Sequence, residues 1–521
     1  MWKKLQIAAI VGTSILLLIA GSVVFMERRF EDPPRSTKRE SFLYGTIGVE
    51  IMPLVVFQVL PDMFPDRFQP AGPKEGDWIQ QYGFVRNTTG ENYGLPHGFA
   101  VSHYRPRSGG PLPVHFVGFS CGLCHTANFR TTEKQEGPVV VGMGNNALDL
   151  FAWVEALQGA LLDEQRLTVD AVDHAYQKKF HRKLKVVEKV VIANWLKQAR
   201  KSLETGIAKW DAPWGPKELR NAAYQPNGPS RTQAFRELVR LYMDRPAASD
   251  RSYSKLPPVY GQRFREWAQA DGSVRSPTTR SVFAALAAGA TVDNLVMPGI
   301  HGNLKNNVEF TRDLQWPKWN ELLPNHPIAA DRAARGRQLY MRHCGDCHGW
   351  PDGQGGWVNG KRMGEVIDAT VIGTDPERVN YRYYDTLTTK LWEAIPASNP
   401  LKPHREDVRP GPLGATRGYI NAPLEGLFTR VPYFHNGSVL TLAEVINLEP
   451  RRDVFYRGRN LYDPVRVGLA SPDALDSRHY YRFDTRLVGN SNKGHDFPWT
   501  YKGPGWDEAQ LRDLLEYLKT L

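Results

Sequence analysis

The sequence predicts a mostly α-helical protein of two similar domains, with long irregular loops and few short strands, behind a helix that crosses a membrane. Three observations predict this fold class. One Cys-x-x-Cys-His motif stands in each half of the 521-residue chain, and an uncharged apolar run lies near its start. The 38 prolines and 46 glycines are spread between segments with helical patterns, which is typical of ordered loops. A chain of this length is also too long for one core.

The two Cys-x-x-Cys-His motifs occupy residues 121–125 and 344–348 and use all four cysteines of the chain. This spacing places both sulfurs against the two vinyl edges of one porphyrin, and the adjacent histidine reaches the iron from the proximal side. We therefore predict two cytochrome-c-like domains, each with one covalently bound haem c. The predicted attachment residues are Cys121, Cys124, Cys344 and Cys347, and the predicted iron ligands are His125 and His348.

A four-cysteine zinc site and a pair of redox dithiols are the competing interpretations of these cysteines. A zinc site usually has its ligand pairs closer in sequence than the 223 positions that separate Cys121 from Cys344. A dithiol motif has no need of a following histidine. Both alternatives therefore fit the pattern less well than haem c does.

The N-terminal run begins at Leu5 and ends at Met26, and two lysines precede it. As a helix it would be about 33 Å long, which is enough to cross a bilayer. Because haem c is normally attached outside the cytoplasmic membrane, we predict a single-pass protein of the bacterial inner membrane with its haem domains in the periplasm. The alternative is a cleaved signal peptide and a soluble periplasmic protein, since Ala20-Gly21-Ser22 offers small residues at the right spacing.

Six segments have patterns that predict helices, and the region from Tyr44 to Arg107 predicts loops and short strands. The predicted helices cover residues 146–164, 187–207, 232–243, 277–288, 331–342 and 506–521. The predicted domains are an anchor or signal peptide at 1–29, a linker at 30–43, the first haem domain at 44–250, a connecting segment at 251–330 and the second haem domain at 331–521.

The net charge of +11 predicts encounters with acidic donor proteins, anionic substrates or lipid headgroups. The basic residues are scattered and form no patch with interleaved aromatics, so we expect no nucleic-acid partner. The expected partners are the inner membrane, through Leu5 to Met26, and a redox protein or a small-molecule oxidant. No residue pattern supports a calcium site.

The segment Pro432-Tyr433-Phe434-His435-Asn436-Gly437-Ser438, with Thr441-Leu442 after it, resembles a signature of the bacterial di-haem cytochrome c peroxidase superfamily. Within that superfamily the chain is more similar to the di-haem rubber oxygenases and their relatives. Shorter segments in the same order support the resemblance, at residues 44–48, 60–65, 95–99, 372–375, 421–426 and 489–495.

The resemblance implies that His435 is the distal ligand of the second haem, opposite His348, with Met363 and His404 as lesser candidates. A second strong axial ligand leaves electron transfer, whereas an open position lets oxygen or peroxide bind. No residue has matching support as the distal ligand of the first haem. The residues considered for it, each more typical of a structural role, are His97, His103, His115, His301 and Met143.

Two departures from the resemblance bear on function. The tryptophan-asparagine-glutamine segment of rubber oxygenases has only Pro257-Pro258-Val259-Tyr260-Gly261-Gln262 as its counterpart, which puts a rubber substrate in doubt. The peroxidase branch has a distal histidine soon after the first motif, but this chain has no histidine between His125 and His174.

The sequence therefore predicts an oxidoreductase of oxygenase or peroxidase type, in which oxygen or peroxide reacts at the first haem and the second relays electrons. The alternative is an electron-transfer cytochrome in which both irons are six-coordinate. The catalytic residues, organic substrate and electron donor do not follow from the sequence.

Overall fold

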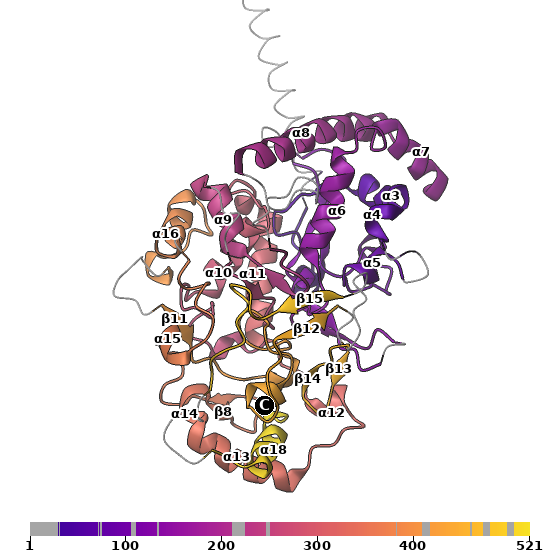
Figure 1. Cartoon of the computed structure of the whole chain (residues 1–521). Coiled ribbons are helices and arrows are strands. Elements are labelled where there is room, and N and C mark those ends of the chain that lie inside the picture. The colour runs from indigo at the N-terminus through magenta and orange to yellow at the C-terminus, as the bar shows by residue number, and fades with distance from the viewer. Residues whose placement is uncertain are drawn as a thin grey trace, which may run out of the picture.

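Helices form most of the regular structure in the computed structural model, and its strands are short and scattered (Figure 1). The structure describes residues 30, 32–70, 72, 76–105, 111–132, 135–210, 225–245, 251–381, 383–408, 417–458, 461–472, 480–496 and 505–521. Helices α3 to α8 gather at one end of the molecule, α13 and α18 at the other, and α9 to α11 lie between them (Figure 1).

The longer helices include all six that the sequence predicts. They are α3 (Leu54–Met63), α6 (Leu150–Leu162), α7 (Val169–Phe180), α8 (Val186–Trp210), α9 (Ala234–Met243), α10 (Pro277–Ala287), α11 (Pro298–Asp313), α13 (Ala330–His343), α16 (Tyr384–Ala394) and α18 (Glu508–Leu518). The shorter helices are α2 (Lys38–Tyr44), α4 (Pro65–Phe68), α5 (Trp78–Gln81), α12 (Trp319–Leu322), α14 (Gly345–His348), α15 (Ala369–Ile372) and α17 (Leu442–Val445).

A three-stranded antiparallel sheet leads into the first motif through its central strand. Its order is β1 (Met52–Pro53), β3 (His115–Phe119) and β2 (Phe99–His103). The other strands form antiparallel pairs. These pairs are β4 (Thr126–Asn128) with β5 (Val139–Val141), β6 (Arg231–Thr232) with β7 (Ser254–Lys255), β8 (Trp350–Pro351) with β9 (Trp357–Val358), β10 (Val366–Asp368) with β11 (Gly418–Ile420), β12 (Val454–Arg457) with β15 (Tyr481–Asp484), and β13 (Tyr462–Asp463) with β14 (Gly468–Leu469).

The region from Tyr44 to Arg107 contains helices that the sequence analysis missed, and α3 shows why. Most of α3 is apolar, and Leu54, Val56 and Leu60 are all buried. A helix that is apolar on nearly every side has no polar stripe and therefore no visible helical period. Pro61, inside the helix, is also a residue that normally signals a helix end.

Two hydrophobic cores hold the molecule together, and both draw on distant parts of the chain. The first core surrounds the β1–β3–β2 sheet with α3, α6 and α10, and α16 joins it by packing on α9. The second core surrounds α13 and α18 and includes Ala127, Phe129 and Met143 from the first half. The predicted domain boundaries at 250 and 330 stay a prediction.

Helices α13 and α18 pack closely against each other at one end of the molecule (Figure 1). A Cβ at Gly336 would lie 1.9 Å from the carbonyl oxygen of Asp513, so only glycine permits this approach. Nε of Arg335 donates to Oδ2 of Asp513 at 2.6 Å beside the contact. The last helix thus docks on the helix that leads into the second motif.

The transmembrane part of the predicted fold class needs correction. Among the residues that the structure describes, no helix is both long and apolar enough to cross a bilayer. Helix α8, with 25 residues, has the length, but Glu188, Lys189 and Lys197 interrupt its apolar surface. The run from Leu5 to Met26 lies outside the described residues. Neither a membrane-spanning helix nor a single-pass location in the inner membrane is supported.

Candidate haem-binding sites

The first motif forms a single turn between β3 and β4. Cys121–Leu123 is a 3-10 helix, and the buried Ser120 before it donates its hydroxyl to the carbonyl oxygen of Leu43 at 2.8 Å. The next loop fixes the end of the motif, because the backbone N–H of Gly142 donates to the carbonyl oxygen of His125 at 2.7 Å. The motif is therefore held from α2 on one side and from the loop after β5 on the other.

His125 has the hydrogen bonding of a metal-ligating imidazole. Its Nδ1 atom lies 2.8 Å from the carbonyl oxygen of Pro257. Because a carbonyl can only accept, Nδ1 carries the proton and Nε2 is left with its lone pair. Burial lowers the pKa of His125 to about 4, so the imidazole is neutral and able to ligate iron at neutral pH.

The second motif lies at the junction of α13 and α14. Tyr340 is fully buried and donates its hydroxyl to the carbonyl oxygen of Gly349 at 2.7 Å. Trp357 donates its indole N–H to the carbonyl oxygen of His348 at 2.9 Å. Two aromatic side chains thus hold the backbone carbonyls of the proposed ligand and of the residue after it.

His348 repeats the arrangement of His125. Its Nδ1 atom lies 2.8 Å from the carbonyl oxygen of Ala422, which again leaves Nε2 for a metal. Burial, with smaller effects of His495 and Arg430, lowers the pKa of His348 to about 4. Two unrelated carbonyls, on different segments, therefore orient the two histidines in the same way.

The cysteines fit thioether attachment better than a zinc site. Among the described residues, which include all four cysteines, no group of three or more His, Cys, Asp and Glu side chains is arranged to hold a metal ion. Burial raises the pKa of Cys121 to about 11 and those of Cys124 and Cys344 to about 12. Each pair of cysteines stands beside an imidazole whose Nε2 is left with its lone pair, as haem attachment at such a motif requires.

A second histidine faces His348. The ring centroids of His348 and His495 lie 6.2 Å apart. Two metal–imidazole bonds of about 2 Å each, with the half-widths of two rings, span about 6 Å. The separation therefore matches two imidazoles on opposite sides of one iron. Burial lowers the pKa of His495 as well, which favours the neutral form.

His435, the residue that the resemblance implies as distal ligand, has a different environment. Its ring stacks on Tyr419 of β11 at 4.5 Å between centroids. Burial, with the charges of Arg378 and Lys255, lowers the pKa of His435 to about 3. Among the described side chains, no ring contact joins His435 to His348. Ligation by His435 stays a prediction.

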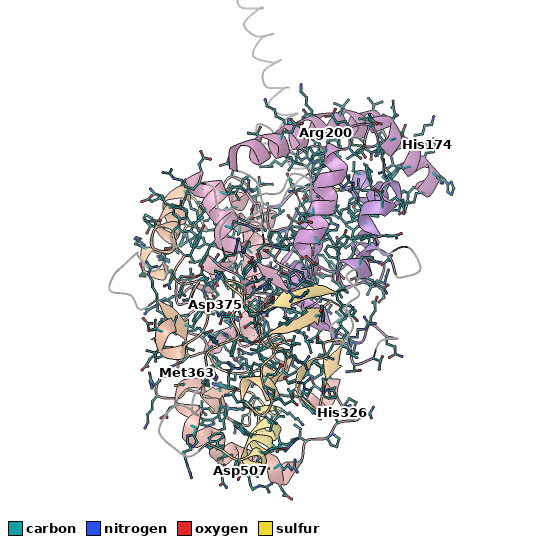
Figure 2. The ribbon with its side chains drawn as sticks, in the orientation of Figure 1. His174, Arg200, His326, Met363, Asp375 and Asp507 are labelled. Atoms are coloured by element: carbon teal, nitrogen blue, oxygen red, sulfur yellow. The ribbon has the colours of Figure 1, made fainter. Side chains whose placement is uncertain are left out.

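The signature around His435 holds the loop that carries His495. Asn436 is fully buried and donates to the carbonyl oxygens of Gly489 and Ser491 at 3.2 and 3.0 Å. Ser438 donates its hydroxyl to the same oxygen of Ser491 at 2.9 Å. The backbone N–H of Ser491 donates in turn to Oδ2 of Asp375 at 3.0 Å. Asp375 is labelled in Figure 2.

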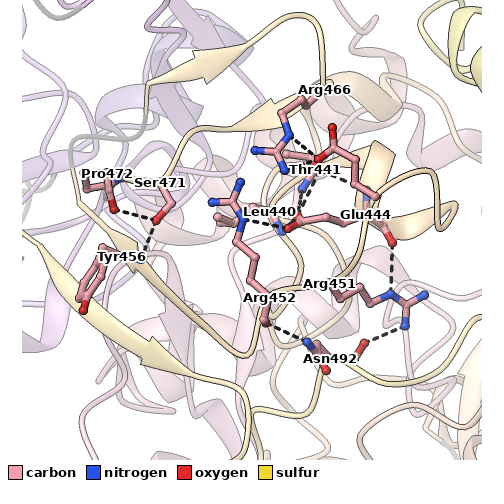
Figure 3. Close-up of polar contacts among 11 residues, drawn as sticks. Leu440, Thr441, Glu444, Arg451, Arg452, Tyr456, Arg466, Ser471, Pro472 and Asn492 are labelled. Carbon is pink, nitrogen blue, oxygen red and sulfur yellow. Dashed lines mark hydrogen bonds and ion pairs between the residues drawn. The ribbon is translucent and has the colours of Figure 1, made fainter. Parts of the chain in front are cut away.

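Arg451 and Arg452 complete this support, as Figure 3 shows. The guanidinium of Arg451 donates to the carbonyl oxygens of Asn492 and Gly494, both at 2.8 Å. The side-chain amide of Asn492 donates to the carbonyl oxygen of Arg452 at 2.9 Å. Helix α17, which Arg451 also reaches, thereby fixes the position of His495.

The proximal histidine of the first motif has different neighbours. Among the described residues, no ring contact joins His125 to another histidine. His97 bonds to Tyr44 at 2.9 Å, and His103 bonds to Asp32 and contacts the ring of His115. His174, the next histidine in the sequence, lies on α7 at the edge of the molecule (Figure 2).

The remaining candidates have other surroundings. Met143 is fully buried in the second core. His301 lies on α11, and His404 is exposed before a 3-10 turn. Met363, labelled in Figure 2, lines a pocket together with Arg265 and Asn421.

Residues 418–456 match a family described as RoxA-like, cytochrome c-like. This part of the chain is cytochrome c-like. The match supports the resemblance to rubber-oxygenase-like c-type cytochromes and implies haem c, while kinship with the wider di-haem peroxidase superfamily is not shown. The matched residues include Tyr419, His435 and the arginines that hold the His495 loop.

Two uncharacterized proteins of Sinorhizobium fredii (strain NBRC 101917 / NGR234) are similar to the chain. Protein y4iJ is 24% identical over 87% of this chain and 86% of its own length. Protein y4iM is 27% identical over 51% of this chain and 64% of its own length. The first likeness extends well beyond the cytochrome c-like region, so the similarity is not confined to one motif.

The sequence analysis missed three parts of these sites. His495 belongs to a segment that carried the resemblance, yet its histidine was not considered as a ligand. The carbonyls of Pro257 and Ala422 could not be found, because any backbone carbonyl can accept a hydrogen bond. The third part consists of Arg265, Arg280 and Arg430, since no sequence signal separates these residues from the others among the 66 Lys and Arg residues of the chain.

Proposed function

We propose that the protein is a di-haem c-type cytochrome that acts as a redox enzyme. Oxygen or peroxide would react at the first site and electrons would be relayed by the second. The observation that carries the proposal is the difference between the two proximal histidines. His348 faces His495 across 6.2 Å, whereas among the described residues His125 faces no second histidine.

The proposed attachment residues are the four cysteines, with His125 and His348 as proximal ligands. For the sixth position of the second iron, the ring separation favours His495 and the resemblance favours His435. We propose His495, because its ring lies at the separation that two ligands of one iron require. His435 would then support the site by packing on Tyr419.

A haem iron with an open position supplies binding of oxygen or peroxide, and an iron with two imidazole ligands supplies electron transfer. The chain itself orients the proximal imidazoles and excludes water from the first site. Pro257 and Ala422 hold the proximal rings in the tautomer that presents Nε2. Phe42, Leu43 and Val259 are buried in one cluster with Cys121. Such an apolar wall favours neutral oxygen and excludes water.

Electron paramagnetic resonance of the purified ferric protein tests the proposal. We expect one high-spin and one low-spin signal of equal weight, and carbon monoxide binding to one iron after reduction. Two low-spin irons without carbon monoxide binding would contradict it and favour an electron-transfer cytochrome. Absence of covalent haem would contradict both functions.

Turnover assays then separate the two reaction types. Hydrogen peroxide with a reduced small cytochrome tests the peroxidase, and oxygen with an unsaturated hydrocarbon tests the oxygenase. The RoxA-like region supports the oxygenase. The absence of any histidine between His125 and His174 speaks against the reductively switched peroxidase.

A further inference from the structure

Two short segments connect the sites and meet between them. The first segment, residues 257–265, starts at the carbonyl that fixes His125 and ends at Arg265. The second, residues 422–430, starts at the carbonyl that fixes His348 and ends at Arg430. They touch where a Cβ at Gly261 would lie 2.9 Å from the side chain of Glu425, and Arg265 forms an ion pair with Glu425.

Positive charge exceeds negative charge at this meeting point. Glu425 is fully buried, and it pairs with Arg265 and with Arg430, the latter at 2.8 Å. Arg280 of α10 donates to the neutral side chain of Gln262 at 2.7 Å, and within the described residues it pairs with no carboxylate. Two guanidinium groups thus share one carboxylate, and a third has none, in surroundings where an unpaired charge is costly.

The excess positive charge acts on the proximal histidines of both motifs. The charge of Arg280 contributes to the lowered pKa of His125, and that of Arg430 to the lowered pKa of His348. Burial lowers the pKa of Arg280 and of Arg430 to about 10 in each case, so both stay charged at neutral pH. Arg265 adds to the repulsion felt by both.

Arg265 also keeps a donor unused. Its Nε is buried and has no hydrogen-bond partner among the described residues, although its side chain reaches the pocket that Met363 and Asn421 line. A buried N–H of a charged group normally finds an acceptor. A carboxylate would satisfy both the unpaired donor and the surplus positive charge.

We propose that Arg265, Arg280 and Arg430 form a carboxylate-binding cluster that takes the propionate groups of both haems. Arg280 binds a propionate of the first haem, Arg430 binds one of the second, and Arg265 contacts both. The inference rests on the proposed function, because the propionates belong to the two haems. The cluster also sets the reduction potentials, since a nearby positive charge favours the ferrous form, which carries one positive charge less.

Spectroelectrochemical titration of the haem-loaded protein tests the cluster. Arg280→Gln should lower the potential of the first haem, Arg430→Gln that of the second, and Arg265→Gln both. The matched control is Arg275→Gln, which removes the same charge from the same stretch of chain. Arg275 is 54% exposed and pairs with Glu266 at 3.4 Å, so neither potential should move.

The conservative variants guard against a loss of folding. Arg280→Lys and Arg430→Lys keep the charge and should keep each potential closer to that of the unmodified protein than the glutamine variants do. The inference is overturned if the glutamine variants retain both haems and shift no potential, or if Arg280→Gln shifts only the second haem. These outcomes differ from a failure of the proposed function, which would show as missing haem or two low-spin irons.

Discussion

The two motif regions share the way in which they orient the proximal histidine and differ on its other side. At both, a backbone carbonyl accepts the Nδ1 proton at 2.8 Å. Among the described residues, only the second proximal histidine has another imidazole in ring contact with it, on a loop that Asn436, Ser438 and Arg451 hold in place. The comparison teaches that the proposed difference in ligand number depends on which side chains pack opposite each proximal histidine. The motif itself is the same in both halves.

Removal of one pair of cysteines should have the largest effect on this comparison. Cys121→Ala with Cys124→Ala should halve the covalently bound haem and leave the low-spin signal. Cys344→Ala with Cys347→Ala should also halve it but leave the high-spin signal. Intact-mass spectrometry counts the haems, and electron paramagnetic resonance identifies the one that remains. Full haem retention in either double variant would contradict the assignment.

Loss of the opposing imidazole should make the two sites alike. His495→Ala should turn the second iron high-spin and let both irons bind carbon monoxide after reduction, because its sixth position opens. His435→Ala should leave the second iron low-spin. His326→Ala, at a surface position seen in Figure 2, is the control. The reverse result, with His435→Ala alone opening the site, would restore the ligand that the resemblance implies.

Weakening of the loop support should disturb only the second site. Asn436→Ala removes the side-chain donor from the carbonyl of Gly489 and leaves that of Ser491 with the hydroxyl of Ser438, which costs about 1–3 kcal/mol of unfolding free energy. We expect a lower denaturant midpoint and a heterogeneous low-spin signal, with the high-spin signal unchanged. Asn194→Ala on the exposed side of α8 is the control. Equal disturbance of both signals would show that the loop is not specific to the second haem.

The first half should carry a pH sensitivity of its own. Burial raises the pKa of Glu50, next to β1, from 4.5 to about 8. The unfolded chain therefore loses this proton first, and stability falls as pH rises from about 4.5 to 8, by about 3 kcal/mol at pH 7. Glu50→Gln should remove this fall in pH-dependent denaturation, whereas Glu164→Gln, at an exposed position, should not. A wild-type pH profile in Glu50→Gln would contradict this prediction.

Local patterns in the sequence predicted local structure well. The patterns at residues 331–342 and 506–521 predicted helices where the structure has α13 and α18, because helical periodicity is visible within a few turns. Helix α3 escaped because it is buried on nearly every side and contains Pro61. The membrane-spanning helix found no support among the described residues, since an apolar run gives a length and a hydropathy but no packing partner.

The sequence by itself determined the cysteine and histidine spacing of both motifs, because one turn of backbone links those residues. Only the tertiary structure decided what surrounds them. Pro257 lies 132 positions from His125, and Ala422 lies 74 from His348. Arg265, Arg280 and Glu425 come together from three segments that show no common pattern. Contacts within a turn follow from covalent geometry, whereas contacts across such distances depend on how helices and loops pack into a shared core.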